Sequence, residues 1–577
     1  MRGLLRLVGL GGGLGLLVFG MFQPEEPTWL LFLWGGIILL AIGASASVQS
    51  LNTGIRKGVL NLAIVFIMLF VMLTVQLLRS QFIYAQSTYD RVVQDSDGNV
   101  TGNIRPVLRS MKVRRGNIVD RNGMLLVGSD ATVDGYARRT YPIAQQADVR
   151  AFSNLLGFSS SRYGQHGLER WWNSWLTGEE GQPLRSLQDD LFHRAHTGNN
   201  LQLTIDWRLQ QQVWDALVRL GGGNPASAVV VEPSSGAILA MVSTPGYDPQ
   251  ALSFNPFEED WSAENTRIAA YWQELNAASG NPLINRPLQG QYAPGSTFKS
   301  VTAAAALVYP EALPQPITCP EEYRPDPNAP PVINAVPNLQ RLTGDPSDLA
   351  RIYAYSCNTA FAELGVGLGA DRLREMAEKF HIYPPRIAPD NSPDLTDLPT
   401  ATSLLALRGT FLDTDLAVAD TSFGQGQLLV TPFQMAMVAA TISNNGVMPK
   451  AYLVERVTDA TNGVVYQHAS RPGLLQERVL PEPVAAEMRE LMRRGVTEGF
   501  GKAAAVPGQS VGGKSGSAQA GLDDPNDIVH AWFTAIAPVE QPRYAVAVMI
   551  ENGRDGAGVG AAAAGEVLRA AFALEGE

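Results

Sequence analysis

The stretch YAPGSTFKS, residues 292–300, places a serine three positions before a lysine, at Ser296 and Lys299, directly after a Pro-Gly break. The segment FKSVTAAAALV that follows favours a helix, in which residues i and i+3 lie on one face. The lysine amine can therefore lie near the serine oxygen, and the helix N-terminus adds a partial positive charge there. A serine hydroxyl is a poor nucleophile until a base takes its proton, and a lysine with a lowered pKa can act as that base. The alternative for this pair alone is a capping serine beside a solvated lysine.

Two more motifs follow in order along the chain. AYSCNTAF carries Ser-x-Asn at Ser356 and Asn358, and VGGKSGSAQ carries Lys-Ser-Gly at 514–516. Each motif is weak alone, but Ser-x-x-Lys, Ser-x-Asn and Lys-Thr/Ser-Gly in this order form the signature of the penicillin-interacting serine acyltransferases. The set therefore favours a nucleophile beside its base over a helix cap.

The pattern from residue 200 onward predicts one sheet made from both ends of a domain. TIDWRLQQQVWDALVRL (204–220) has the apolar spacing of an amphipathic helix, and ASAVVVEPSSGAILAMVS (226–243) reads as a β-hairpin. A mostly helical stretch runs from the first motif to about residue 445. Strands are then expected in the segments 510–520, 530–538 and 543–553, followed by a last helix at 561–574. The helical stretch is expected as an insertion between the two halves of the sheet.

Further segments resemble class B penicillin-binding proteins. NRPLQGQYAPGSTFK (285–299) is similar to the segment that leads to their nucleophile, and GQGQLLVTPFQMA (424–436) to the helix after their second motif. HAWFTAIAP (530–538) resembles the strand after the third motif, and RRGNIVDRNGMLL (114–126) resembles the pedestal hairpin, with DRNG as its turn. The resemblance runs from about residue 105 to the C-terminus. It implies an α/β transpeptidase fold, in which helices flank an antiparallel five-stranded sheet and a mainly helical subdomain is inserted. A β-rich pedestal and transmembrane helices precede that domain.

The resemblance also implies a catalytic role for each motif residue. Ser296 would attack the carbonyl between the two D-alanines of a peptidoglycan stem peptide, and Lys299 would accept its proton. Ser356 would pass a proton to the departing D-alanine. Asn358 would hydrogen-bond Lys299 and the substrate backbone. Lys514 would supply positive charge toward Ser356 and the substrate carboxylate.

The third motif would bind the substrate. Ser515, which replaces the commoner threonine, and Ser517 would offer hydroxyls to the terminal carboxylate, and Gly516 would let the strand approach the substrate. The backbone N–H groups of Ser296 and Ser517 would form the oxyanion hole. Penicillin would mimic the D-alanine pair and stall as an ester, so β-lactams are expected inhibitors.

The N-terminal part of the chain predicts a membrane region. The apolar runs 29–48 and 58–78 carry no charged side chain, and each is long enough for a hydrocarbon core about 30 Å thick. A shorter, glycine-rich run at about 4–22 could also span if Arg6 reaches the interface, and its alternative is a signal peptide. We expect three transmembrane helices.

Charges between the runs predict the orientation. Arg2 and Arg6 precede the first run, Arg56 and Lys57 precede the third, and the acidic QPEEPTW separates the first two. Basic segments stay cytoplasmic, so three spans place the N-terminus in the cytoplasm and everything after the third run outside. The expected location is the bacterial cytoplasmic (inner) membrane. The expected domains are a membrane region at 1–80, a pedestal, or dimerisation-like domain, at 81–199 and a penicillin-binding transpeptidase domain at 200–577.

Composition excludes several other classes of function. The formal net charge is −11 and no long basic run occurs, so a nucleic-acid partner is not expected. No Cys-x-x-Cys or His-Glu-x-x-His occurs, and we expect no metal and no cofactor. For Cys319 and Cys357 we expect two free thiols, with pairing in an oxidising compartment as the alternative. Trp172 and Trp175, three apart, are expected to be core residues rather than a sugar-binding site.

The expected function is a membrane-anchored D,D-transpeptidase that crosslinks stem peptides. The region between membrane and transpeptidase domain is too short for the glycosyltransferase domain of a class A enzyme. Polymerisation would therefore fall to a partner, by analogy a membrane glycosyltransferase of the shape, elongation, division and sporulation (SEDS) family. Three spans depart from the usual single span of the class. The alternatives are a β-lactamase or D,D-carboxypeptidase, in which water resolves the ester, and a non-enzymatic β-lactam-binding scaffold that activates a membrane glycosyltransferase.

Overall fold

The computed structural model describes most of the chain, in two compact units that are described separately, Met1–Ser110 and Met111–Glu577. The described residues are 6–48, 55–84, 93–94, 100–101, 105–181, 197–385, 396, 398–468, 477–519 and 528–575. Arg2, whose charge was used to predict the orientation in the membrane, lies outside the described residues.

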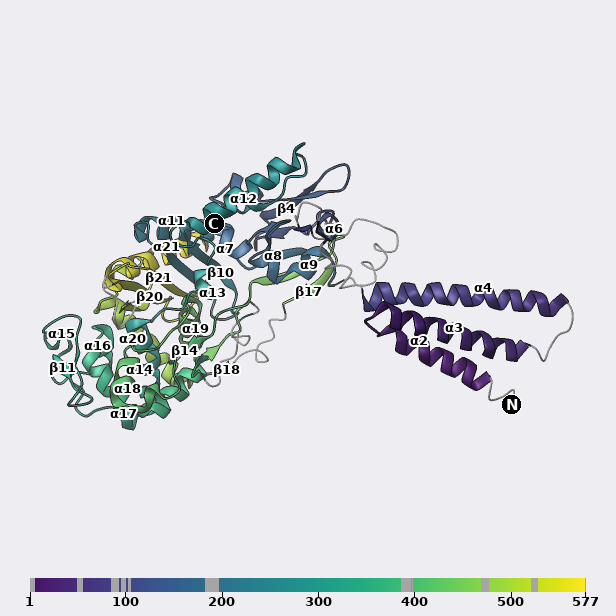
Figure 1. The fold of residues 1–577 in the computed structure, drawn as a ribbon. Helices are drawn as coiled ribbons and strands as arrows, with labels where there is room; N and C mark the ends of the chain where they lie inside the picture. The colour runs from purple at the N-terminus through teal and green to yellow at the C-terminus, as the bar shows by residue number, and fades with distance from the viewer. Residues whose placement is uncertain are drawn as a thin grey trace. The chain divides into compact units, whose positions relative to one another are not determined.

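The first unit is a small bundle of apolar helices (Figure 1). Its elements are the π-turn η1 (Val8–Gly12), α2 (Gly13–Met21), α3 (Glu26–Val48), α4 (Ile55–Leu78), the π-turn η2 (Arg79–Ile83), the short strands β1 (Val93–Gln94) and β2 (Val100–Thr101), and α6 (Arg105–Ser110). Helices α2 and α3 pack through glycine, since a Cβ on Gly13 would lie 2.8 Å from the carbonyl oxygen of Gly36. Beyond this contact, toward the start of α2 and the end of α3, the Arg6 guanidinium donates to the carbonyl oxygen of Ala46.

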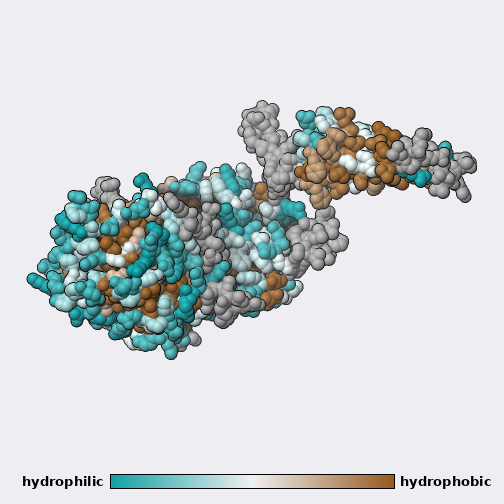
Figure 2. Space-filling view, turned by 90° about the horizontal axis from the view of Figure 1, so that it is seen from below, coloured by the Kyte–Doolittle hydropathy of each residue, from teal (hydrophilic) through white to brown (hydrophobic). Residues whose placement is uncertain are grey.

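Hydropathy marks these helices as candidate membrane spans. Within the described residues, Glu26–Ala46 and Lys57–Ile83 are long and apolar enough to cross a membrane, and Val8–Met21 is a shorter apolar helix. Hydrophobic residues gather on the outside of this unit (Figure 2). The helix Gly556–Glu575 is also long and apolar enough to cross a membrane, but half of it is buried and it packs on the sheet of the second unit. Its apolar character is therefore explained by core packing.

A six-stranded sheet forms the pedestal part of the second unit, in the order β17-β16-β8-β3-β4-β5. The predicted hairpin is present as β3 and β4, and the Asp120 carboxylate accepts the N–H groups of Asn122 and Met124 in the DRNG turn. Trp172 and Trp175 pack against Tyr466 of β17, as a core role requires. The pedestal elements are β3 (Ile118–Val119), β4 (Leu125–Ala131), β5 (Ala137–Thr140), η3 (Pro142–Gln145), α7 (Arg150–Leu156), β6 (Ser159–Ser160), β7 (Gly164–Gln165), α8 (Leu168–Trp171), α9 (Asn173–Thr177), β8 (Asn200–Leu203), β16 (Val454–Thr458) and β17 (Val464–Gln467).

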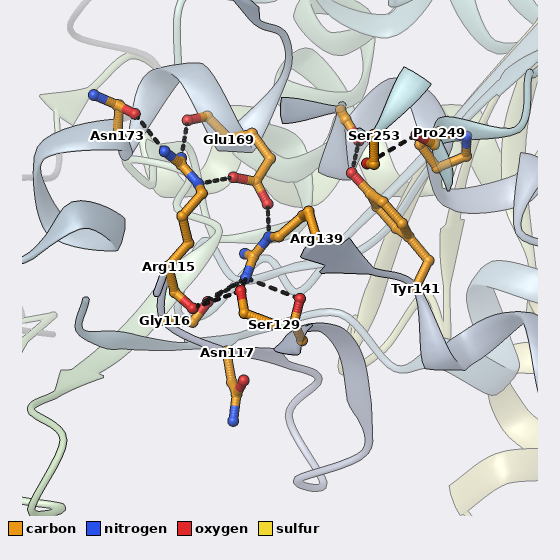
Figure 3. Close-up of polar contacts among 12 residues, drawn as sticks. Arg115, Gly116, Asn117, Ser129, Arg139, Tyr141, Glu169, Asn173, Pro249 and Ser253 are labelled. Carbon is orange, nitrogen blue, oxygen red and sulfur yellow. Dashed lines mark hydrogen bonds and ion pairs between the residues drawn. The ribbon is translucent and has the colours of Figure 1, made fainter. Parts of the chain in front are cut away.

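A buried ion cluster holds the pedestal sheet to α8 (Figure 3). The Glu169 carboxylate accepts from Arg115 Nε at 2.7 Å and from Arg139 Nε at 2.6 Å, and its side chain has no exposed surface. Arg139 Nη1 also donates to the Gly116 carbonyl at 2.7 Å, and Ser129 Oγ donates to the Arg115 carbonyl at 2.9 Å. Two guanidinium groups and one carboxylate thus share a water-poor site, where each charge depends on its partners.

The second sheet has five antiparallel strands in the order β10-β9-β21-β20-β19, so the chain's two ends meet in it as predicted. Its central strands are runs of small and β-branched residues that are buried along their whole length. Helices α11 and α21 cover one face, and α19 and α20 pack against the strands as well. The strands and these helices are α11 (Trp207–Gly221), β9 (Ala226–Val231), β10 (Ile238–Thr244), α19 (Pro432–Ser443), α20 (Glu482–Thr497), η8 (Lys502–Ala504), β19 (Gly512–Gln519), β20 (Val529–Ala537), β21 (Tyr544–Ile550), the π-turn η9 (Gly556–Gly560) and α21 (Ala561–Glu575).

The chain between β10 and α19 is mainly helical, as the sequence predicts. Its elements are η4 (Pro249–Leu252), α12 (Trp261–Ala277), α13 (Arg286–Gln289), η5 (Gly295–Phe298), α14 (Lys299–Val308), η6 (Pro310–Ala312), β11 (Glu322–Tyr323), β12 (Val332–Ile333), α15 (Gln340–Thr343), α16 (Leu349–Ala354), α17 (Asn358–Lys379), β13 (Ile382–Tyr383), β14 (Ser403–Leu404), η7 (Phe411–Asp413) and α18 (Asp415–Ser422). The short strands β15 (Val447–Met448) and β18 (Glu477–Arg478) pair with each other beyond it.

The expectation of two free thiols is wrong. Cys319 and Cys357 form a disulfide, and both residues are fully buried. Their separation of 38 positions carries no information about distance, whereas the fold brings their Cα atoms to 6.2 Å, within reach of a bridge.

Candidate active site

The first motif lies on a tight turn that leads into a helix. Ser296 is part of the short 3₁₀ turn η5, and Lys299 begins α14, as the sequence predicts. Gly295 has φ +54°, and a Cβ there would lie 2.6 Å from the carbonyl oxygen of Ser517. Only glycine fits this position, because both the dihedral angle and the approach of β19 exclude a side chain. Ser296 is partly exposed, while Lys299 is completely buried.

The buried amine of Lys299 faces the second motif. Its Nζ donates to the carbonyl oxygen of Ser356 at 2.8 Å, to Ser356 Oγ at 3.2 Å and to Asn358 Oδ1 at 2.7 Å. Nζ also lies 5.4 Å from the centre of the Phe361 ring. The first two motifs are therefore in direct contact, although Lys299 begins α14 and Ser356 lies in the turn before α17.

The third motif reaches the same hydroxyl from β19. Lys514 Nζ donates to Ser356 Oγ at 2.9 Å and to the Ser515 carbonyl at 2.9 Å. Ser515 and Ser517 lie on the same face of β19, because side chains alternate along a strand. Ser515 is nearly buried, whereas Ser517 is exposed and its Oγ accepts the N–H of Gly556 at 3.2 Å.

Gly516 lies where β19 passes the nucleophile turn. A Cβ there would lie 2.9 Å from the Pro294 carbonyl oxygen and 3.1 Å from the Thr297 nitrogen. The strand and the turn that carries Ser296 thus touch through backbone atoms. The seven residues of the three motifs, together with Ser517, are gathered around this contact.

Burial perturbs both lysines. The pKa of Lys299 lies well below its ordinary value, first because burial disfavours the ammonium ion and second because Lys514 adds a like charge. Burial also lowers the pKa of Lys514 to about 7. A buried amine with a lowered pKa, beside hydroxyl groups of two motifs, is suited to accept a proton from a serine.

The turn at Ser356 is strained. Its φ of +56° is a left-handed conformation that a residue with a Cβ rarely adopts. This geometry points both the carbonyl oxygen and Oγ of Ser356 at Lys299. A strained backbone that persists in a closely packed site is typical of functional positions.

Some residues around the site carry no signal in the sequence. Tyr353 bonds Ser300 Oγ through its hydroxyl at 2.8 Å, and its ring lies 5.7 Å from Lys514 Nζ. Asn334 contacts the start of α17, as described below. Neither residue belongs to one of the three motifs. Tyr353 lies three positions before Ser356, whereas only the fold brings Asn334 to the site. Among the described residues, no group of three or more His, Cys, Asp or Glu side chains could hold a metal ion.

Family models cover most of the second unit. Residues 226–573 match the model "Penicillin binding protein transpeptidase domain", and residues 115–201 match "Penicillin binding protein A dimerisation domain". The first match alone spans more than half of the chain and includes all three motifs.

Relatives and solved structures agree with these matches. The peptidoglycan D,D-transpeptidase PbpA of Mycobacterium tuberculosis is 35% identical over 489 residues, which are 82% of this chain and 92% of the relative. The protein of the same name in Mycolicibacterium smegmatis is 35% identical over 478 residues, 82% of this chain and 91% of the relative. The structure of penicillin-binding protein A from M. tuberculosis as a penicillin G acyl-enzyme complex superposes with a TM-score of 0.68 at 33% identity, covering 80% of this chain and 99% of that one. From its motifs, its fold and these matches, the chain belongs to the class B penicillin-binding proteins.

Proposed function

We propose that the protein is a peptidoglycan D,D-transpeptidase that crosslinks stem peptides through an acyl-enzyme on Ser296 and is inhibited by β-lactams. The observation that carries the proposal is the buried Lys299, which contacts Ser356 and Asn358 and lies one helical turn from Ser296. The name of the PbpA relatives and the penicillin G acyl-enzyme of penicillin-binding protein A support the same reaction.

Acylation begins at the partly exposed hydroxyl. Lys299 takes the proton of Ser296 Oγ while that oxygen bonds to the carbonyl carbon between the two D-alanines. The backbone N–H groups of Ser296 and Ser517 stabilise the oxyanion, and losing one such donor typically costs about 10²–10³ in rate. The C–N bond then breaks, and the departing D-alanine nitrogen takes a proton through Ser356 Oγ, which Lys299 and Lys514 both contact.

Substrate binding falls to the third motif and to Asn358. The positive charge of Lys514 and the hydroxyls of Ser515 and Ser517 hold the substrate's terminal carboxylate, while Asn358 bonds the substrate backbone. Gly516 keeps the edge of β19 open for close approach of the peptide. In the second half-reaction, the amine of a neighbouring stem peptide loses its proton, attacks the ester carbonyl and releases Ser296, which regains its proton.

The alternative readings have less support. A β-lactamase or D,D-carboxypeptidase shares the motifs and differs in using water as the acceptor, and a scaffold needs no chemistry at Ser296. The two PbpA relatives, of which the match covers more than nine tenths, are named transpeptidases. Their name favours an amine as the acceptor.

Labelling of the full-length, detergent-solubilised protein with a fluorescent penicillin tests the proposal. Wild type should form a stable adduct and Ser296→Ala should form none, while Ser262→Ala, an exposed serine at the start of α12, should label like wild type. A wild-type protein that never forms an adduct contradicts the proposal. With a stem-peptide donor and an amine acceptor, mass spectrometry should find the crosslinked dimer, and hydrolysed donor alone would indicate a carboxypeptidase.

The same proposal extends to domains and location. The membrane region is assigned to residues 1–80, the pedestal to 81–199 and the transpeptidase domain to 200–577, which contributes the strands β8, β16 and β17 to the pedestal sheet. The protein is anchored in the cytoplasmic membrane by the apolar helices α2, α3 and α4, with its N-terminus inside and its catalytic domain outside, as the flanking charges favour. Cysteine accessibility at an introduced site near residue 52 and at one near residue 85 would test this topology.

A SEDS-family glycosyltransferase is the proposed partner, because residues 81–199 are a short stretch for a glycosyltransferase domain between the apolar helices and the transpeptidase domain. The two helices beyond the single span that is usual in this class are the proposed contact with the glycosyltransferase. The protein should no longer co-purify with the glycosyltransferase when residues 1–50 are deleted. Co-purification that survives the deletion would contradict this contact.

A further inference from the structure

A segment with no known motif lies against the Ser-x-Asn turn. It runs from residue 319 to residue 334, between η6 and α15, and contains β11 and β12. Its first residue, Cys319, is joined by the disulfide to Cys357, the residue between Ser356 and Asn358. The disulfide therefore links the segment covalently to the middle residue of the second motif.

The last residue of the segment caps the helix that follows the motif. Asn334 Oδ1 accepts the backbone N–H of Asn358 at 2.8 Å and that of Thr359 at 3.2 Å. These are the first N–H groups of α17, which have no partner inside their own helix. Asn334 Nδ2 donates to the Pro320 carbonyl at 2.8 Å and to Thr359 Oγ1 at 3.2 Å. One side chain thus ties both ends of the segment to the helix start.

The residue before it sets the orientation of a motif side chain. Asn358 Nδ2 donates to the Ile333 carbonyl at 3.1 Å, which leaves Oδ1 to accept from Lys299 Nζ. An amide held by one donor bond and one acceptor bond cannot flip without losing both. The segment therefore fixes which end of Asn358 faces the lysine.

We propose that Asn334 and the Cys319–Cys357 disulfide are positioning groups for catalysis, which clamp the Ser356–Asn358 turn so that Ser296 is acylated at full rate. The inference rests on the proposed function. Neither group contacts Ser296, and both act through Ser356 and Asn358. The turn needs such support because Ser356 has a left-handed backbone and would relax away from Lys299 if the chain on either side were free.

Saturation kinetics with a fluorescent penicillin on the full-length protein test the clamp. The variant Asn334→Ala should lower the acylation rate constant roughly tenfold, leave the half-saturating concentration unchanged, and label to full stoichiometry at long times. Asn334→Asp should recover part of the rate, since its carboxylate still accepts both N–H groups at a helix N-terminus but loses the Nδ2 bonds to Pro320 and Thr359. Asn328→Ala, an exposed asparagine of the same segment, is the matched control and should behave like wild type.

The disulfide is tested by the pair Cys319→Ser with Cys357→Ser. Serine at 357 keeps an acceptor for the N–H of Ala360, which Cys357 Sγ now accepts at 3.4 Å, so the variant removes the covalent link and leaves that cap. Its acylation rate constant should fall as in Asn334→Ala. Incomplete final labelling would report an unfolded fraction, which is separated from the rate of the folded fraction.

The outcomes distinguish the two levels of inference. Failure of the wild type to be acylated overturns the proposed function. Normal acylation of wild type together with wild-type rate constants for Asn334→Ala and for the cysteine pair overturns the clamp alone. Equal loss in Asn334→Asp and Asn334→Ala overturns the role of Asn334 as a helix cap.

Discussion

Lys299 and Lys514 donate to one and the same oxygen, Ser356 Oγ, at 3.2 and 2.9 Å. Both side chains are buried, so two ammonium ions at this distance from one hydroxyl would be costly. The pair thus favours a state in which Lys299 is the neutral member, because the charge of Lys514 adds to burial in lowering its pKa. This division of roles leads to the first prediction.

The pH profile of acylation should have an alkaline limb that comes from Lys514. Its pKa of about 7 means that the charge facing the substrate carboxylate is lost as the pH rises through that value. Lys514→Arg keeps its charge at every accessible pH, so the alkaline limb should disappear while the acid limb, from Lys299, remains. The second-order rate constant of penicillin acylation between about pH 5 and pH 10 measures this. An alkaline limb at the same pH in both proteins would contradict the assignment.

Two substitutions at Ser356 should lower activity equally but differ in stability. Ser356→Ala and Ser356→Gly both remove the proton-transferring hydroxyl, so acylation should fall by about 10²- to 10⁴-fold in each. Glycine adopts φ +56° freely and alanine does not, so the glycine variant should be more stable than the alanine variant by about 1 kcal/mol. Thermal unfolding of the two variants checks the order, and a more stable alanine variant would refute the strain.

Glu169 should be essential for pedestal stability. Burial alone would raise the pKa of Glu169, but Arg139 and Arg115 outweigh burial and lower it. Its stabilisation is therefore present above the unfolded pKa and lost as the pH falls through the lowered folded value. Glu169→Gln leaves two buried guanidinium groups uncompensated and should cost about 3–5 kcal/mol in urea unfolding.

The exposed ion pair of Arg374 and Asp371 is the control for that prediction. The Asp371 side chain is 97% exposed, so Asp371→Asn should leave the unfolding midpoint unchanged. Equal midpoints for Glu169→Gln and wild type would show that the buried cluster contributes no net stability.

Gly516 should be required for steric reasons alone. A methyl group there would press on the backbone of Pro294 and Thr297, and a displacement of about 1 Å at a reacting group can cost about 10²-fold in rate. Gly516→Ala should therefore lose acylation roughly to that extent, while Gly221→Ala, whose added Cβ would meet nothing closer than 3.9 Å, should retain it. Unchanged acylation in Gly516→Ala would show that the turn and β19 can separate without loss.

Local patterns predicted the elements of this protein well. The DRNG turn, the hairpin at 226–243 and the terminal strands follow from turn residues and apolar periodicity, which act over a few residues. Order along the chain was enough to predict that the two ends share a sheet. The strands β16 and β17, which complete the pedestal sheet from residues 454–467, were not predicted. The reason is that β16 pairs with β8 about 250 residues earlier, and β17 pairs with β16.

The sequence by itself determined the motif set, the apolar N-terminal helices and the sharing of one sheet by both ends of the domain, since these depend on residue type, short-range spacing and order along the chain. Only the tertiary structure decided that Lys514 reaches Ser356 across 158 positions, that Cys319 pairs with Cys357, and that Asn334 caps α17. The physical reason is that such contacts result from the burial of the whole core. Burial brings distant segments together and turns two ordinary lysines into a low-pKa pair, and no local pattern encodes either effect.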